Sequence, residues 1–108
     1  WVREKRAMTL EAAVHRLTGQ TAKVFGIRER GLLRTGYAAD LMLFDPCTVA
    51  RGAKQRVRDL PAGGARLITP AIGVHGVWVN GVRVADERGP RVDAGRRLPG
   101  CVLREFDA

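Results

Sequence analysis

The chain has 108 residues, enough for one domain or part of one, whereas a complete (β/α)8 barrel needs ~200. An apolar share of 45% and a charged share of 28% are typical of a folded protein rather than a disordered one. No apolar run approaches the ~20 residues of a membrane span, so no membrane partner is expected. The charged start without methionine favours a piece of a longer protein.

The charge balance is basic. Nineteen Lys and Arg against 11 acidic residues give a formal net charge of +8, which would attract polyanions. The arginines are scattered singly, and an aromatic share of 6% leaves few rings to stack on bases. We therefore expect a solvated basic surface and do not expect nucleic acid as a partner. Cys47 and Cys101 form no CxxC pair, and they are expected to be free thiols in a cytoplasmic protein, with one disulfide as the alternative.

The first predicted elements form a helical hairpin. Thr9 is the expected N-cap of the first helix, and a second short helix is predicted over residues 20–25, ending at a left-handed Gly26. Apolar residues at helical spacing give the first helix one apolar face: Leu10, Ala13, Val14 and Leu17. This face must pack against another element.

A short apolar run follows. Leu41–Phe44 stands between Asp40 and Asp45 and predicts a central strand covered on both faces, which Pro46 ends. The two aspartates would lie on opposite faces of an extended chain, so they are expected to cap turns rather than to act as paired carboxylates. Residues 46–66 hold Pro, Gly and basic residues without a clear period, which predicts a long surface loop.

Asn80-Gly81 between alternating apolar residues predicts a β-hairpin closed by a two-residue type I′ turn. The closure sets the expected cross-strand pairs: Val79 with Val82, Trp78 with Arg83, Val77 with Val84, and His75 with Asp86. Residues 88–108 are expected to wrap the sheet and to end frayed.

The residues present do not predict an active site. His15 is expected to be a solvated helix histidine, and His75 a structural partner of Asp86, since the chain contains no serine and no cysteine close to His75 in sequence. The sequence contains no HxH, HExxH, phosphate-binding loop or dinucleotide fingerprint. No catalytic, cofactor-binding or metal-binding residue is assigned.

Five blocks occur in an order that matches a known family: residues 8–18, 21–26, 30–33, 36–46 and 77–81. They resemble the C-terminal end of amidohydrolase-superfamily enzymes, most closely the N-acyl-D-amino-acid deacylases (D-aminoacylases). The Asp59-to-Ala65 and Leu98-to-Arg104 segments echo late features of that subgroup.

The resemblance implies an α+β chain. Residues 1–27 would be the last helical elements of an absent barrel, and residues 28–108 the C-terminal part of a β-sandwich with the long loop 46–66. The intact enzyme would use zinc to hydrolyse the amide of N-acyl-D-amino acids. Its metal ligands would lie upstream, so this chain alone is expected to be inactive. The alternatives are a dihydropyrimidinase-like or dihydroorotase-like amidohydrolase, or a basic nucleic-acid-binding or oligomerisation module.

An unpartnered apolar face and unpaired sheet edges invite association. The expected partner is the missing N-terminal barrel or another copy of this chain, with exchange through the 46–66 loop as one route to a homo-oligomer.

Overall fold

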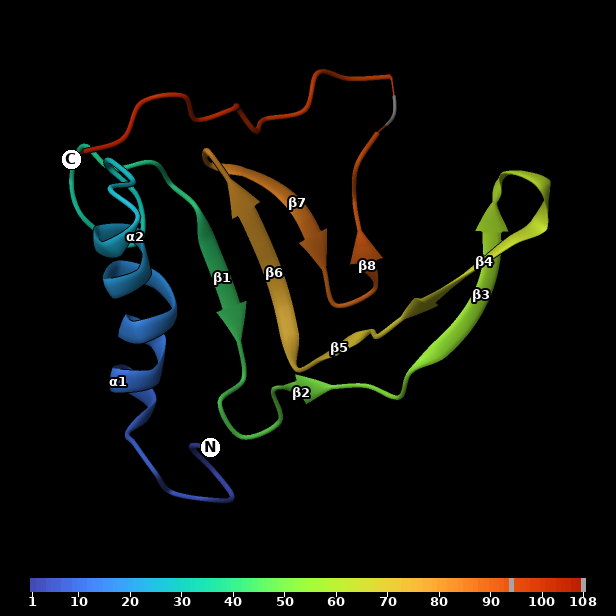
Figure 1. Ribbon diagram of the computed structural model, residues 1–108, viewed down its shortest axis with the longest axis horizontal. Helices are drawn as coiled ribbons and strands as arrows, with labels where there is room; N and C mark the ends of the chain where they lie inside the picture. Colours follow the sequence, from blue (N-terminus) through green and yellow to red (C-terminus); the bar gives the residue numbers. More distant parts are fainter. Residues whose placement is uncertain (94, 108) are drawn as a thin grey trace.

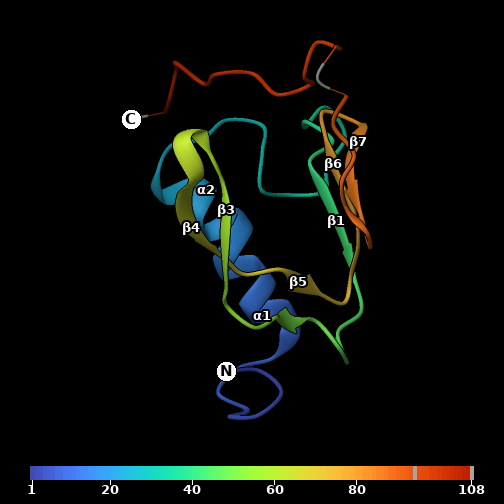
Figure 2. The same ribbon diagram turned by 90° about the vertical axis from the view of Figure 1, so that its right-hand side faces the viewer.

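The computed structural model describes residues 1–93 and 95–107 as an α+β arrangement with three parts (Figure 1). A helical segment lies beside a four-stranded antiparallel sheet, and a long bent hairpin, here called the arm (residues 50–72), extends away from the sheet. The side view in Figure 2 places the arm and the helices on the same side of the sheet.

The helical segment is one continuous helix rather than the predicted hairpin. Helix α1 (Leu10–His15) runs through a π-helical turn (Arg16–Gln20) into α2 (Thr21–Val24), with right-handed helical dihedrals at both junctions. The Thr18 and Thr21 hydroxyls donate to helix carbonyls over 2.7 Å, so the region around Gly19 widens the helix without ending it.

Both predicted ends of the helical segment are confirmed. The Thr9 side chain accepts a hydrogen bond of 3.2 Å from the Ala12 backbone N–H at the N-terminus. At the other end Gly26 adopts φ 64°, and the Ile27 N–H donates to the Ala22 carbonyl over 2.8 Å. This is the left-handed termination that glycine favours.

The sheet has the strand order β1-β6-β7-β8, all antiparallel. Its strands are β1 (Leu41–Phe44), β6 (Val74–Val79), β7 (Val82–Asp86) and β8 (Gly89–Pro90). The predicted strand at β1 is confirmed, but its predicted central position is wrong. Among the described residues it pairs with β6 alone and lies at the edge of the sheet, and Met42 is 56% exposed. An apolar run predicts that a strand will be covered, but not which element covers it.

The β6–β7 hairpin has the predicted turn and a different register beyond it. Val79 faces Val82 and Trp78 faces Arg83, as predicted. A β-bulge between Val77 and Trp78 then shifts the remaining pairs by one residue.

The shifted pairs are Val77 with Ala85 and Gly76 with Asp86, so the predicted Val77–Val84 and His75–Asp86 pairs are wrong. The bulge accompanies the fold of the Trp78 ring over Gly76, where a Cβ would lie 2.4 Å from the indole. Only a residue without a side chain allows this approach.

The predicted loop over residues 46–66 is replaced by strands. Strand β2 (Ala50–Arg51) pairs with β5 (Ala71–Ile72), and β3 (Gln55–Leu60) pairs with β4 (Gly64–Ile68), which together form the arm. A 3-10 turn, Pro61–Gly63, closes the β3–β4 hairpin, with Ala62 and Gly63 at φ 58° and 69°. Both faces of the arm are largely solvent-exposed, so its strands carry no apolar alternation by which sequence analysis could find them.

These parts enclose almost no core. Ala22 is the only buried apolar residue of the part described, and no large side chain there is fully buried. The Cα radius of gyration is 16.4 Å, whereas a compact domain of this length has ~13 Å. Within residues 1–93 and 95–107, no helix is long and apolar enough to cross a membrane. Most of the large apolar side chains described are therefore exposed.

Candidate functional site

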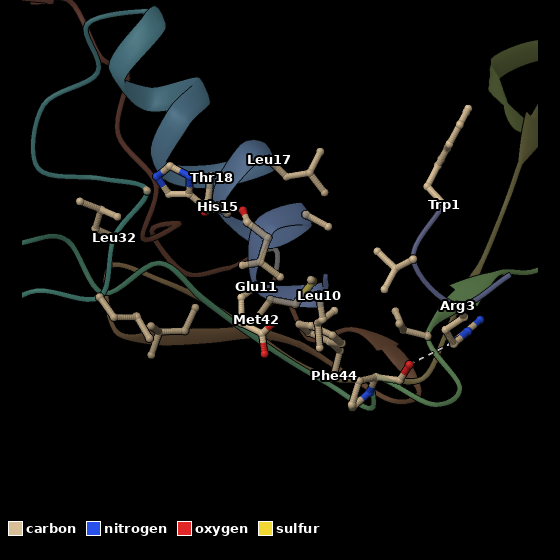
Figure 3. A pocket seen from close by; sticks show the side chains of 18 of the residues that line it. Trp1, Arg3, Leu10, Glu11, His15, Leu17, Thr18, Leu32, Met42 and Phe44 are labelled. Atoms are coloured by element: carbon tan, nitrogen blue, oxygen red, sulfur yellow. Dashed lines mark hydrogen bonds between the residues drawn. The ribbon is translucent and has the colours of Figure 1, made fainter. Parts of the chain in front are cut away.

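An apolar groove of about 920 Å³ lies between the N-terminal residues, the helical segment and the edge strand β1 (Figure 3). Its apolar lining comes from elements far apart in the sequence: Val2, Leu10, Val14, Leu17, Leu32, Met42 and Phe44. The groove is open, since Leu17 is 78% exposed and Met42 is 56% exposed. The apolar face of the first predicted helix thus lines an open groove beside the edge strand β1.

Polar groups at the rim of the groove do not form a reactive set. The Arg3 guanidinium donates to the Pro46 carbonyl over 3.2 Å, and Glu11 and His15 lie along the helix side (Figure 3). His15 is exposed, as expected of a solvated helix histidine, although it borders the groove. The lining of the groove is thus mostly apolar, with a few polar side chains among it.

A polar cluster lies around Asp40, which directly precedes β1 and also lines the groove. Its Oδ1 accepts the backbone N–H of Asn80 over 2.8 Å, and its Oδ2 pairs with the Arg30 guanidinium. Arg30 also donates to Asn80 Oδ1 over 3.3 Å and to Cys101 Sγ over 3.4 Å, and Asn80 Nδ2 donates to the Pro99 carbonyl over 2.7 Å. The hydrogen bond from the Asn80 backbone, followed by Arg30, lowers the pKa of the Asp40 carboxyl below its usual value.

This cluster joins four segments, and sequence analysis predicted only part of it. Asp40 was expected to cap a turn and Asn80 to form the hairpin turn, and both predictions are confirmed. The roles of Arg30, Pro99 and Cys101 were missed. The sequence did contain a signal for them, because Arg30 opens the block 30–33 that resembles the family. Pro99 and Cys101 lie in the Leu98-to-Arg104 segment, which also resembles it.

Asp45 also caps a turn, as predicted. Its two carboxylate oxygens accept from the Cys47 N–H over 2.8 Å and from the Thr48 hydroxyl over 2.9 Å. The hydrogen bond from the Cys47 backbone, then that from Thr48, lowers the pKa of Asp45. Asp40 and Asp45 are each satisfied locally and do not act as a pair.

His75 and Asp86 do not meet. Asp86 is buried, accepts from the Arg88 N–H over 2.8 Å and forms an ion pair with Arg91. These contacts, the Arg88 hydrogen bond first, lower the pKa of Asp86. His75 is exposed, and its carbonyl accepts from Arg83 over 2.7 Å. The bulge therefore separates the two residues that the simple register would have paired.

The donor set does not fit a metal ion. Among residues 1–93 and 95–107, no three His, Cys, Asp or Glu side chains gather where they could hold one. The aspartates of the clusters above are each paired with arginine or with backbone N–H groups, which is the chemistry of structural ion pairs and caps. Cys47 and Cys101 are both free and exposed, and no disulfide links them.

Comparison with known proteins identifies the class. The model of the amidohydrolase family matches residues 1–85, and the chain belongs to this family. Over 107 residues, 99% of this chain, it is 46% identical to the N-acyl-D-aspartate deacylase of Alcaligenes xylosoxydans xylosoxydans. It is 41% identical to the D-aminoacylase of the same organism over 82% of the chain, and 37% identical to its N-acyl-D-glutamate deacylase over 91%. The resemblance drawn from the sequence blocks is thereby confirmed.

The chain spans only 19%, 16% and 18% of the lengths of these three curated relatives. A dihydroorotase of Lactobacillus helveticus matches over a shorter stretch, 42% of this chain, so the dihydroorotase-like alternative is not favoured. No solved structure matches the chain significantly. Members of the amidohydrolase family generally use a metal. The residues described here include no group of side chains that could hold one.

Proposed function

We propose that this chain is the non-catalytic C-terminal portion of a hydrolase that cleaves the amide bond of N-acyl-D-amino acids. The observation that carries the proposal is the sequence identity of 37–46% between this chain and three deacylases, over 82–99% of the chain. The substrate named for two of them has an acidic side chain, so N-acyl-D-aspartate and N-acyl-D-glutamate are the first substrates to test.

The groove and the edge of β1 support a packing role. Apolar residues of the helical segment and β1 stay exposed around a space of about 920 Å³, which a covering element would fill favourably. We propose that the rest of the same enzyme covers this surface: a barrel against the helical segment, and further strands that complete a β-sandwich beyond β1. The cytoplasm is the proposed compartment, and zinc the proposed metal, held by residues outside this chain.

Association with a second copy of this chain is the alternative. Sedimentation at tens of micromolar distinguishes a second copy from the rest of the enzyme, because self-association through the groove requires a dimer or larger species. A chain that sediments as a monomer and binds a separately produced barrel part supports covering by the rest of the enzyme.

The arginines give little support to a nucleic-acid-binding module. Five of them, Arg28, Arg30, Arg66, Arg91 and Arg96, form ion pairs with aspartates within this chain. Their charge is partly neutralised, and the part described presents no row of aromatic rings for bases.

The decisive experiment compares two proteins. The purified chain and a longer protein that carries it are each incubated with N-acetyl-D-aspartate and zinc, and released amino acid is measured by chiral chromatography. We expect D-aspartate from the longer protein, none from this chain, and none from the N-acetyl-L-aspartate control. Turnover by this chain alone, or a longer protein inactive on every N-acyl-D-amino acid tried, contradicts the proposal.

A further inference from the structure

The last part of the chain runs back across the molecule after β8. Residues 95–107 pass the β6–β7 turn and reach the end of the helical segment, and they contain no helix or strand (Figure 1). Residues 98–107, here called the strap, therefore link the sheet to the helical segment, in addition to the chain connection over residues 27–40 and the Arg3–Pro46 hydrogen bond.

Polar contacts hold the strap at both ends. Near its start, Asn80 Nδ2 donates to the Pro99 carbonyl over 2.7 Å, and Arg30 donates to Cys101 Sγ over 3.4 Å. At its end, the Asp107 N–H donates to the Gly26 carbonyl over 2.8 Å, and the Asp107 carboxylate pairs with Arg28.

Gly26 is shaped to receive the strap. A Cβ at this position would lie 2.1 Å from the Asp107 carbonyl oxygen and 2.9 Å from its nitrogen. The backbone of Asp107 thus occupies the space that any other residue at position 26 would fill. Glycine at position 26 serves the helix end and the strap at once.

The apolar side chains of the strap do not anchor it. Val102 is 79% exposed, Leu98 58%, Phe106 51% and Leu103 39%, so none of them is buried in a core. A segment held by a few polar contacts at the surface belongs to the least stable parts of a protein, which open without global unfolding.

We propose that residues 98–107 form a releasable latch, seated on Gly26, that holds the end of the helical segment to the β6–β7 turn. The latch sets how far the helices stand from the sheet, and its release uncovers the Arg30–Asp40 pair. This inference concerns the fold of the chain and does not rest on the proposed activity.

The test uses Gly26→Ala and a matched control in the intact protein. At Gly36 the backbone is also left-handed, at φ 86°, but a Cβ there would meet nothing within 4 Å. Both variants place a side chain on a residue with left-handed backbone dihedrals. Only Gly26→Ala also puts a methyl group where the Asp107 backbone lies. Tryptic cleavage after Arg104, followed by mass spectrometry, reports release of the strap. We expect cleavage to accelerate by about tenfold or more in Gly26→Ala and to stay within about twofold of the parent in Gly36→Ala.

A second pair of variants covers the outcome in which Gly26→Ala fails to fold. Asp107→Pro removes the N–H that bonds the Gly26 carbonyl, whereas Asp107→Asn keeps that N–H and removes only the charge. We expect rapid cleavage after Arg104 in the first and near-parental cleavage in the second. Equal rates in both members of either pair, or an unprotected Asp107 amide in hydrogen exchange of the parent, overturn the latch.

Discussion

The backbone N–H of Asn80 donates to Asp40 Oδ1 over 2.8 Å, which joins the β6–β7 turn to the residue that precedes the edge strand β1. Beside it the Gly81 N–H donates to the Ala39 carbonyl over 2.9 Å, and Arg30 pairs with the second Asp40 oxygen. Only one apolar residue is buried among those described, so these polar junctions join parts of the fold that no shared apolar core holds together.

Asp40→Asn is expected to lower the free energy of unfolding by about 1 kcal/mol, because it weakens a charge-assisted contact that is about one-third exposed. Urea unfolding of the intact protein measures the change. The control is Asp93→Asn, whose ion pair with Arg96 is far more exposed and should contribute nothing measurable. Equal effects in the two variants would show that the Asp40 junction is not stabilising.

Stability should fall on acidification. The pKa values of Asp40, Asp45, Asp59 and Asp86 are all lowered in the folded chain, chiefly by hydrogen bonds from Asn80, Cys47, Arg66 and Arg88 respectively. Each carboxylate therefore contributes stability that is complete above its unfolded pKa of about 3.9 and is lost as the pH falls through the lower folded value.

Thermal unfolding between pH 7 and pH 2.5 tests this sign. We expect a nearly constant Tm down to about pH 5 and a decline below about pH 4. Asp40→Asn should make the decline shallower, whereas Glu4→Gln should not. A Tm that rises as the pH falls from 5 to 3 would contradict the expectation.

Gly81→Ala tests the β6–β7 turn. Gly81 has φ 78°, and the only atom near a Cβ there is Ala39 Cβ at 3.9 Å, so the substitution adds backbone strain without a clash. We expect a loss of about 1–2 kcal/mol in urea unfolding. Gly100→Ala, which has neither a left-handed backbone nor a near neighbour, should stay within about 0.5 kcal/mol of the parent.

Gly76→Ala tests the contact between the Trp78 ring and β6 beside the bulge, whose extra residue is Val84 in β7. The added methyl group would overlap the Trp78 ring, which must move away from its position 5.3 Å from the Arg83 guanidinium. We expect a loss of about 1–3 kcal/mol and a shift of tryptophan emission, read in a Trp1→Phe background. Unchanged emission would show that the ring does not lie over position 76. The control is Gly95→Ala, where a Cβ makes only ordinary contact.

Arg66→Gln tests the arm. The Arg66 guanidinium binds both oxygens of Asp59 over 2.8 and 2.6 Å, across the β3–β4 hairpin. Removing this two-pronged contact should speed hydrogen exchange of the β3 and β4 amides and leave β6 and β7 unchanged. Arg56→Gln, at a residue for which no ion pair is described, should change neither region. Faster exchange throughout the sheet would mean that the arm and the sheet open together.

Elements with short-range signals were predicted well. The Thr9 cap, the Gly26 terminus, the Leu41–Phe44 strand and the Asn80-Gly81 turn all depend on a few adjacent residues, and all are confirmed. The β3–β4 hairpin was missed because both of its faces are exposed, so its strands lack apolar alternation. Gly19 was misread as a break, because threonine hydroxyls stabilise a wider helical turn there.

Short-range residue preferences were enough to predict the Thr9 cap, the Gly26 terminus and the Asn80-Gly81 turn, and residue order was enough to identify the family. Which parts lie together depends on contacts between distant segments: β1 at the edge, the bulge that separates His75 from Asp86, and the Arg30–Asp40–Asn80 and Gly26–Asp107 junctions. These contacts join residues that are 40 positions apart for Asp40 and Asn80, and 81 for Gly26 and Asp107. The chain must close on itself before such contacts can form, so no local pattern encodes them.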